Sequence, residues 1–313
     1  MTLNLKELSR KEEVLVGGHR LCTGCGPAIA MRQMTIAAEN PLVIANATCC
    51  VEISTVVYPY TSWTCSWYHN AFENAGAVIS GVESTYKALK RRGKVKDDFR
   101  FVAIGGDGGT YDIGFQALSG MLERRHRALY LCYDNNAYMN TGIQRSGATP
   151  HYAWTTTTHA GAAQQGKQQM RKDLAMIAVA HEVPYVATSV VGPGTFWRDF
   201  MGKVQRALAT DGPSVIVILA PCWRGWRIDY SQTLEIGKLA ADTGAWPLYE
   251  VVDGKWKWSY TPKVKRPIQD YLKPQGRFSH LFQPGNEALI PEVQAEVDRK
   301  WTQVDKFVKM SES

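Results

Sequence analysis

The chain has 313 residues, 45% of them hydrophobic and 21% charged, which is an ordinary composition for a globular protein. No stretch approaches the roughly 20 consecutive apolar residues of a membrane span, and the N-terminal residues lack the apolar core of a secretory signal. We therefore expect a cytoplasmic protein without a membrane partner. The net charge of +7 is spread along the chain, and its densest basic run, residues 87–96, is interpreted as a solvated helix end, so no nucleic-acid partner is expected.

Strands and helices alternate along most of the chain. Five mostly apolar runs predict strands that are covered on both faces, at residues 42–47, 99–105, 128–134, 184–190 and 214–220. Helical patterns lie between and beside them, at residues 27–39, 70–91, 112–125, 171–182 and 194–209. Such alternation predicts an α/β fold with a doubly wound, mostly parallel sheet.

The pattern changes after residue 230. We divide the chain into an α/β domain, residues 1–230, and a C-terminal extension, residues 231–313, that packs on this core or on a partner subunit. The extension is predicted to hold a helix at 231–243, a hairpin around Asp253-Gly254 and a last helix at 286–310. Before it, residues 143–170 lack periodicity and predict a long loop, which in a compact domain is often functional.

A lone carboxylate, Asp107, lies between glycines directly after the strand predicted at 99–105. Glycines let the backbone approach a ligand, and the following helix offers free N–H groups to a phosphate. Asn135 follows the next predicted strand, so it should return to the same edge of a parallel sheet. Mg²⁺ takes about six oxygen ligands, and the carbonyl of Ala137 could join the two side chains.

The GDG sequence followed 28 residues later by NN resembles the thiamine diphosphate motif of thiamine-dependent enzymes. The resemblance implies that Asp107, Asn135 and the carbonyl of Ala137 hold the Mg²⁺ of the diphosphate, with Gly106 and Gly108 against the cofactor. The alternative is a glycine turn and an unrelated Asn-rich turn. A nicotinamide-type loop is favoured even less than this alternative, since its spacing differs and no acidic partner follows the first strand.

The chain has seven cysteines: Cys22, Cys25, Cys49, Cys50, Cys65, Cys132 and Cys222. An odd count without an export signal indicates metal or redox chemistry in place of a disulfide framework. Cys132 is interpreted as a core residue, and Cys65 has no identifiable partner.

Two of these cysteines, Cys22 and Cys25, precede a predicted helix, whose dipole should lower their thiol pKa. Cys222 and the pair at 49–50 each follow a predicted strand, so they should lie at the same edge of the sheet. Cys22 and Cys25, Cys222 and one cysteine of the pair would together make a site of four thiolates. Four cysteine ligands suit zinc or an iron–sulfur cluster, and the spacing does not separate the two.

A second resemblance covers residues 17–245, in order. The segments GHRLCTGCG, NATCCVEISTVVYPYTSW, HNAFENAGA, GGDGGTYDIGFQALSG, CYDNNAYMNTGIQRSGATP and APC look like the β subunit of 2-oxoacid:ferredoxin oxidoreductases, of the pyruvate and oxalate type. The resemblance implies that residues 1–230 bind thiamine diphosphate and one [4Fe–4S] cluster. The cluster ligands would be Cys22, Cys25, Cys50 and Cys222. The family usually has glycine where this chain has Cys49, and the register favours Cys50.

The same resemblance implies the reaction. The expected function is oxidative decarboxylation or cleavage of a small 2-oxoacid, with pyruvate as the family default and oxalate next. Electrons would pass to the cluster and on to ferredoxin, with other subunits as partners and coenzyme A as a possible co-substrate. Asn140 is expected to contact the substrate or intermediate, or else to serve a turn, and Thr141 beside it to contact the cofactor. Arg145, Arg224 or Arg227 would mark a more anionic acid such as oxalate.

One catalytic part is missing from the pattern. Thiamine enzymes need a carboxylate at the aminopyrimidine ring, and Glu73 is a candidate by residue type alone. In the family this glutamate comes from another subunit, so the chain is expected to be inert alone. Asn70 is interpreted as a helix cap or a site residue, and His69 as a packed or surface histidine.

Two alternatives stay open. One is a nonoxidative thiamine-dependent decarboxylase or synthase with a structural zinc at the cysteines. The other is a non-catalytic electron-transfer subunit, against which the intact Asp107 and Asn135 argue. Only the identity of the metal separates the first alternative from the oxidoreductase.

Overall fold

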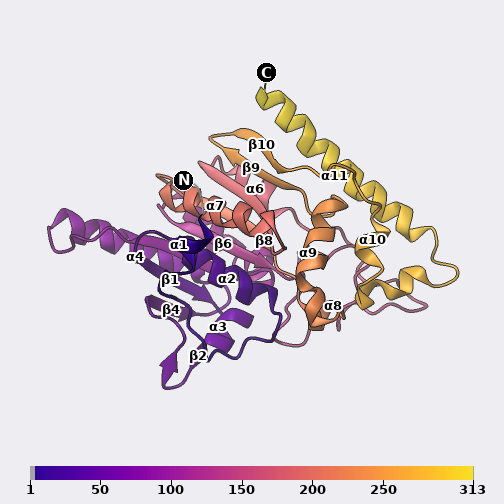
Figure 1. Cartoon of the computed structure of the whole chain (residues 1–313), viewed down its shortest axis with the longest axis horizontal. Coiled ribbons are helices and arrows are strands. Elements are labelled where there is room, and N and C mark those ends of the chain that lie inside the picture. Colours follow the sequence, from indigo (N-terminus) through magenta and orange to yellow (C-terminus); the bar gives the residue numbers. More distant parts are fainter. Residues whose placement is uncertain (1–3, 313) are drawn as a thin grey trace.

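The computed structural model describes residues 4–312, and an eight-stranded sheet forms its centre, in the order β10-β9-β7-β8-β6-β5-β1-β4 (Figure 1). The parallel strands are β1 (Leu42–Ala47), β4 (Ser66–Asn70), β5 (Arg100–Gly106), β6 (Leu129–Asp134), β7 (Tyr185–Val190) and β8 (Ser214–Leu219). A hairpin of β9 (Leu248–Val252) and β10 (Lys255–Tyr260) adds antiparallel pairing beside β7. The fold is thus the predicted doubly wound, mostly parallel sheet.

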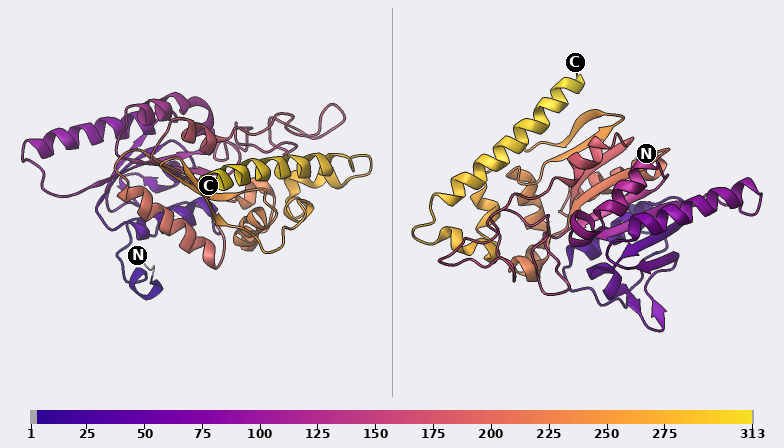
Figure 2. Two further views of the ribbon diagram at one scale, coloured as in Figure 1. Left: turned by 90° about the horizontal axis from the view of Figure 1, so that it is seen from above. Right: turned by 180° about the vertical axis from the view of Figure 1, so that it is seen from behind.

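The helices are α1 (Leu5–Leu8), α2 (Gly26–Ala37), α3 (Cys50–Thr55), α4 (Ala75–Arg91), α5 (Phe115–Glu123), α6 (Leu174–Ala180), α7 (Thr195–Ala209), α8 (Trp223–Trp226), α9 (Thr233–Asp242), α10 (Gln269–Leu272) and α11 (Leu289–Glu312). Further short helices are the π-helix η1 (Gly109–Ile113) and the 3-10 helices η2 (Tyr230–Gln232) and η3 (Gly276–Phe282). A small hairpin joins β2 (Val56–Val57) to β3 (Tyr60–Thr61). Helices α4 and α11 lie at opposite ends of the molecule (Figure 2). No described helix is long and apolar enough to cross a bilayer.

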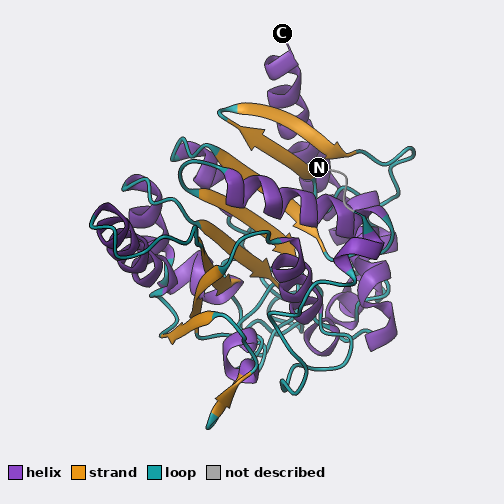
Figure 3. Cartoon of the chain, turned by 60° about the vertical axis from the view of Figure 1, so that its left-hand side comes forward, coloured by secondary structure: helices purple, strands orange, loops and turns teal. Residues whose placement is uncertain are grey.

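Both faces of the sheet are buried because its strand side chains alternate between two cores. In β1, Val43 and Ala45 face the core that contains Ile79 of α4, while Ile44 faces the core that contains Met31 of α2 and Phe200 of α7. Figure 3 shows the strands between layers of helices, with loops collected beyond the arrowheads of the parallel strands. Those loops carry the residues that the sequence motifs single out.

One predicted helix, 70–91, is wrong at its start. Residues 66–70 form strand β4, which pairs with β1 in parallel, and the helix begins only at Ala75. Pairing with β1 at the sheet edge satisfies the backbone N–H and C=O groups of these residues, which would otherwise form hydrogen bonds within a helix. Asn70 is therefore the last residue of a strand, and its interpretation as a helix cap is wrong.

The C-terminal residues pack on the core. The predicted turn at Asp253-Gly254 joins β9 to β10, and β9 pairs with β7. Helix α11 lies against this hairpin through stacked rings, with Trp258 and Trp301 at 4.3 Å between centroids and Trp256 and Phe307 at 4.8 Å. The division of the chain at residue 230 stays a prediction.

Candidate functional site

Asp107 lies directly after β5 and is fully buried. Because β5 and β6 pair in parallel, Asn135 after β6 lies beside it, and the Asn135 backbone N–H donates to Asp107 Oδ1 at 3.2 Å. The Ser146 hydroxyl donates to Asp107 Oδ2 at 2.5 Å. Gly108 must be glycine here, since a Cβ would lie 2.4 Å from the Tyr138 ring. The carboxylate is therefore held by neutral donors in a tightly packed loop.

Three oxygen atoms converge at this loop. The side-chain oxygen of Asn135 lies 2.9 Å from Asp107 Oδ1 and 3.0 Å from the Ala137 carbonyl. Without a cation, this amide would turn over and donate its NH₂ group to both acceptors. Two oxygens bound to one Mg²⁺ at about 2.1 Å and at a right angle lie about 3 Å apart. The oxygen-inward arrangement has the donor set and the spacing of a magnesium site.

The charge of Asp107 is poorly compensated within the chain. Burial, together with the neighbouring carboxylate of Asp134, raises the pKa of Asp107 well above its usual range. Asp134 itself is neutralised by Arg171, whose guanidinium lies 2.6 Å from it, and it accepts a hydrogen bond from Tyr111 at 2.8 Å. A bound cation would supply the compensation that Asp107 lacks.

A small cavity gathers the predicted cofactor residues. Its wall includes Gly106, Asp107, Gly108, Asn135, Ala137, Asn140 and Thr141, together with Cys49 and Cys50. Asn140 is exposed, and the Thr141 hydroxyl hydrogen-bonds to Gln144. The carboxyl ends of β5 and β6 and the start of α3 thus form one concave surface.

The cysteine residues come to the same edge from three segments. Cys22 and Cys25 form a turn closed by a 3.1 Å hydrogen bond from the Cys25 N–H to the Cys22 carbonyl. The next residue, Gly26, packs so closely on Pro221 that an added Cβ would lie 2.6 Å from the Pro221 carbonyl oxygen. This contact places the turn beside Cys222.

The thiol pKa values differ from the sequence expectation. Burial, with smaller contributions from the charges of Cys222 and Cys22, raises the pKa of Cys25 to about 12. The backbone N–H of Ala28 at the start of α2 lowers this pKa, as the sequence predicts for a helix N-terminus, but burial outweighs it, so the predicted net lowering is wrong for this residue. Burial also raises the pKa of Cys50, to which the charges of Cys222 and Cys25 contribute. The thiols thus lie within electrostatic reach of one another, and burial outweighs the opposing effect of the Arg277 charge on the pKa of Cys222.

Cys49 and Cys50 point to different surroundings. Cys49 is buried and accepts a hydrogen bond from the Asn46 amide at 3.4 Å, and an added Cβ at Gly106 would lie 3.3 Å from the Cys49 Cβ.

Among residues 4–312, no three His, Cys, Asp or Glu side chains gather closely enough to hold a single metal ion. A four-iron cluster does not require such a group, because each of its cysteines binds a different iron atom.

Several other predicted residues lie away from the small cavity. His69 pairs with the buried Glu52 at 3.1 Å, and both side-chain polar atoms of Asn70 are buried without a hydrogen-bond partner among the described residues. Glu73 lies in the turn before α4, with its backbone against Gly114. The structure brings neither His69 nor Glu73 into the cavity wall.

The three predicted arginines are also placed elsewhere. Arg227 stacks on Trp154 at 3.7 Å, and Arg224 lies over Trp223 at 5.5 Å. The backbone N–H of Arg145 donates to Thr157 at 2.9 Å. None of these arginines lines the small cavity.

Sequence reasoning missed Ser146 and the buried network around Asp134. Ser146 comes from the long segment after β6, whose path no periodicity predicts. Asp134 directly precedes Asn135, so an acidic residue at the end of a buried strand was the available signal for an internal ion pair.

The fold and the site define a thiamine-dependent protein. Residues 47–218, more than half of the chain, match the family model for the C-terminal TPP-binding domain of thiamine pyrophosphate enzymes, thiamine pyrophosphate being another name for thiamine diphosphate. The pyruvate synthase subunit PorB of Thermotoga maritima is 46% identical over 311 residues, covering 96% of this chain and 95% of that protein. The chain therefore belongs to the family of 2-oxoacid:ferredoxin oxidoreductase β subunits, and it is a subunit of a thiamine-dependent oxidoreductase.

Other relatives agree. PorB of Methanocaldococcus jannaschii is 49% identical over 292 residues, which make up 93% of this chain and 96% of that protein. The ketoisovalerate oxidoreductase subunit VorB of Pyrococcus abyssi is 41% identical, with coverage of 96% and 94%. The solved structure of 2-oxoglutarate:ferredoxin oxidoreductase from Magnetococcus marinus, with 2-oxoglutarate, coenzyme A and succinyl-CoA bound, shares the fold with a TM-score of 0.53 at 16% identity, over 69% of this chain and 76% of that one.

Proposed function

We propose that this chain is the thiamine diphosphate-binding subunit of an enzyme that oxidises pyruvate, releases CO₂, and passes the electrons to ferredoxin. PorB relatives at 46% and 49% identity carry the name pyruvate synthase, which supports pyruvate over the branched substrate in the name of VorB at 41%. The three arginines that would have favoured oxalate lie outside the small cavity. Coenzyme A is the proposed acceptor of the acyl group.

The convergence of three oxygens carries the proposal. Asp107, Asn135 and the carbonyl of Ala137 would hold Mg²⁺, and Gly106 and Gly108 would lie against the diphosphate. Thiamine diphosphate, when bound, supplies a carbanion and accepts the electrons left by decarboxylation. Asp107 binds the cation through its carboxylate, and Ser146 fixes the orientation of that carboxylate by donating to its second oxygen. Asn140 is exposed in the cavity wall, which supports the proposal that it would donate to a bound substrate.

The proposed cluster ligands are Cys22, Cys25, Cys50 and Cys222. Buried thiols with raised pKa values become favourable as thiolates only when a cation neutralises them, and iron provides this neutralisation. Cys50 lies within electrostatic reach of Cys25 and Cys222, whereas Cys49 packs against Gly106. This contrast supports Cys50 as the third ligand. A [4Fe–4S] cluster at this edge would neighbour the thiamine site.

The test is a metal analysis of the chain purified without oxygen, together with the subunits that accompany it. We expect about four iron and four sulfide per chain beyond the content of the other subunits, and an electron paramagnetic resonance signal after reduction. Zinc in place of iron, or no metal, would contradict the proposed cluster in this chain and the electron transfer through it.

Two neighbouring cysteines give a matched pair of variants. Cys50→Ser should remove the cluster signal of this chain, as Cys22→Ser should. Cys49→Ser should retain it, because Cys49 lies in the apolar core beside Gly106. Loss of the signal in Cys49→Ser with its retention in Cys50→Ser would reverse the assignment.

A further inference from the structure

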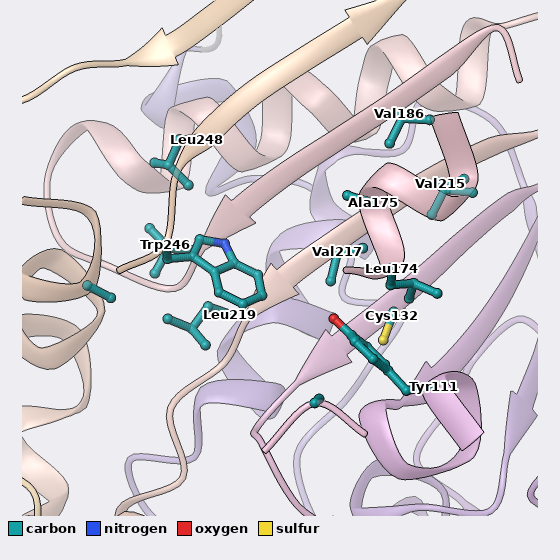
Figure 4. Packing of buried hydrophobic residues seen from close by; sticks show 14 of the residues in the cluster. Tyr111, Cys132, Leu174, Ala175, Val186, Val215, Val217, Leu219, Trp246 and Leu248 are labelled. Atoms are coloured by element: carbon teal, nitrogen blue, oxygen red, sulfur yellow. The ribbon is translucent and has the colours of Figure 1, made fainter. Parts of the chain in front are cut away.

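A second, much larger cavity lies beneath the C-terminal helix α11. Its volume is about 680 Å³, which falls within the range of small-molecule sites. Its wall shares no residue with the cavity beside Asp107. Figure 4 shows part of this wall, in which Trp246, Tyr111 and the β8 pair Val217 and Leu219 come from three separate segments. The cavity is therefore formed by the core and the C-terminal extension together.

Most of the inner wall is apolar or aromatic. Leu219 on β8 and Leu174 on α6 form one part, and Tyr271, Leu272 and Phe278 form another. All five side chains are at least 95% buried. A wall of this composition favours a ligand with a hydrocarbon or aromatic body.

One buried polar group in this wall lacks a partner. Trp246 is 6% exposed, and its indole N–H makes no hydrogen bond with a described residue. Tyr249 is 1% exposed and lines the same cavity. An indole N–H can only donate, and buried donors are rarely left unsatisfied. The ligand should therefore bring a hydrogen-bond acceptor.

The mouth of the cavity has an excess of unpaired positive charge. Lys300 is paired with Asp173, and the His151 ring lies 2.5 Å from the Glu296 carboxylate. Arg299 and Lys306 are seven residues apart, so they lie on the same face of α11. Both are exposed at the mouth and form no ion pair in the described part of the chain. Such a rim complements an anionic group.

We propose that this cavity binds a small amphipathic anion, with an apolar body among the aromatic residues and a carboxylate or similar group at the α11 rim. The wall contains none of the proposed cofactor ligands, although Asn136 between Asn135 and Ala137 lines it, and the proposal does not depend on the function proposed above.

The test is isothermal titration calorimetry of the assembled enzyme with dodecanoate as the probe, below its micelle concentration. We expect one saturable site per copy of this chain. Val297→Trp, which fills the cavity from the half-buried face of α11, should weaken binding at least tenfold. The double variant Arg299→Glu with Lys306→Glu changes only exposed side chains and should also weaken binding at least tenfold.

Lys309→Glu provides the matched control, because Lys309 lies on α11 outside the cavity wall. Its affinity for dodecanoate should equal that of the unchanged enzyme. Absence of saturable binding, or equal binding by the unchanged enzyme and both rim and cavity variants, would overturn the proposal. Iron content and turnover, measured on the same samples, report on the proposed function and are expected to be unchanged in all of these variants.

Discussion

Asp107 shows how a single residue can be costly to the fold and necessary to the site. Its carboxylate is fully buried, and burial with the nearby Asp134 raises its pKa well above the usual range. Desolvation of a charge without a counter-ion destabilises a protein. The residue is explained if a cation binds there, since the cation then offsets the unfavourable burial.

The first prediction concerns Asp107→Asn. Without cofactor, the variant should unfold at the same or a higher temperature, because asparagine has no charge to desolvate. Its affinity for thiamine diphosphate with Mg²⁺ should fall at least about 100-fold, since even indirect partners of metal sites are worth 10–100-fold. Differential scanning fluorimetry with and without Mg²⁺ and cofactor measures both effects.

Asp211→Asn is the control for that experiment, because the Asp211 side chain is 95% exposed. It should change neither the stability nor the cofactor response. A variant of Asp107 that is strongly destabilised without cofactor, yet still stabilised by it, would contradict the assignment.

The sequence predicted this part of the site because Asp107 and Asn135 occupy equivalent positions. Both directly follow buried strands, and parallel neighbours end at the same edge. Ser146 could not be predicted, because it reaches Asp107 from an irregular segment. The assignment of Cys50 over Cys49 rested on register in the sequence, and the structure adds the different surroundings of the two thiols.

At the scale of elements, the start of α2 determines where the Cys22–Cys25 turn lies. An added Cβ at Gly26 would lie 2.6 Å from the Pro221 carbonyl oxygen and 2.8 Å from the Ala220 carbonyl carbon. These are backbone atoms that cannot move aside as a flexible side chain would. Gly26→Ala should therefore push α2 away from the residue that follows Pro221, which is Cys222.

The second prediction compares two glycines in helices. Gly26→Ala should destabilise the protein by about 1–3 kcal/mol through overpacking and lower the iron content per chain. Gly81→Ala on α4, where an added Cβ meets no atom within 4 Å, should stabilise it by up to about 1 kcal/mol. Thermal unfolding and iron analysis of both variants test the prediction. Unchanged iron in Gly26→Ala would show that the contact does not position the cysteines.

Lys167 anchors the long loop after β6. The residue is 1% exposed, and its ammonium group donates to the carbonyl of Thr149 at 2.5 Å. Burial first, and the cations Arg145 and Arg171 next, lower the pKa of Lys167 to about 8, against the opposite effect of Asp112 and Asp134.

The third prediction follows from this lowered pKa. Between pH 8 and the ordinary lysine range, the folded chain holds fewer protons on Lys167 than the unfolded chain. The contribution of Lys167 to stability therefore rises with pH across this window. The stability advantage of the unchanged protein over Lys167→Met should be larger at pH 9.5 than at about pH 7. Equal advantages in chemical denaturation at the two pH values would contradict this prediction.

The elements themselves were mostly predictable. The five buried strands were predicted because short, continuous apolar runs bounded by turn residues are typical of strands covered on both faces. Strand β4, SWYHN, was missed because it lies at the edge of the sheet and is partly exposed, so its composition does not distinguish it from the start of a helix. Its position depends on pairing with β1, a contact that local sequence does not encode.

At the scale of the whole molecule, the site of this chain lacks most of the charges that the reaction requires. Among the described residues, Asp107 is the one charged side chain in the wall of the small cavity, and the proposed cation would occupy it. The substrate carboxylate needs a cationic partner, and the aminopyrimidine ring needs an acid. Neither Glu73 nor the three arginines line the small cavity, so we infer that another subunit supplies both groups.

The last prediction tests this division of labour. The isolated chain should bind thiamine diphosphate and Mg²⁺ but show less than about one thousandth of the pyruvate-dependent ferredoxin reduction of the assembled enzyme, because positioning and proton transfer each contribute a hundredfold or more. Adding the remaining subunits should restore turnover, while adding them to Asp107→Asn should not. Glu73→Gln in the assembled enzyme should keep most of its activity, since Glu73 lies outside the cavity wall. Turnover by the isolated chain that is lost in Glu73→Gln would instead place the activating acid within this subunit.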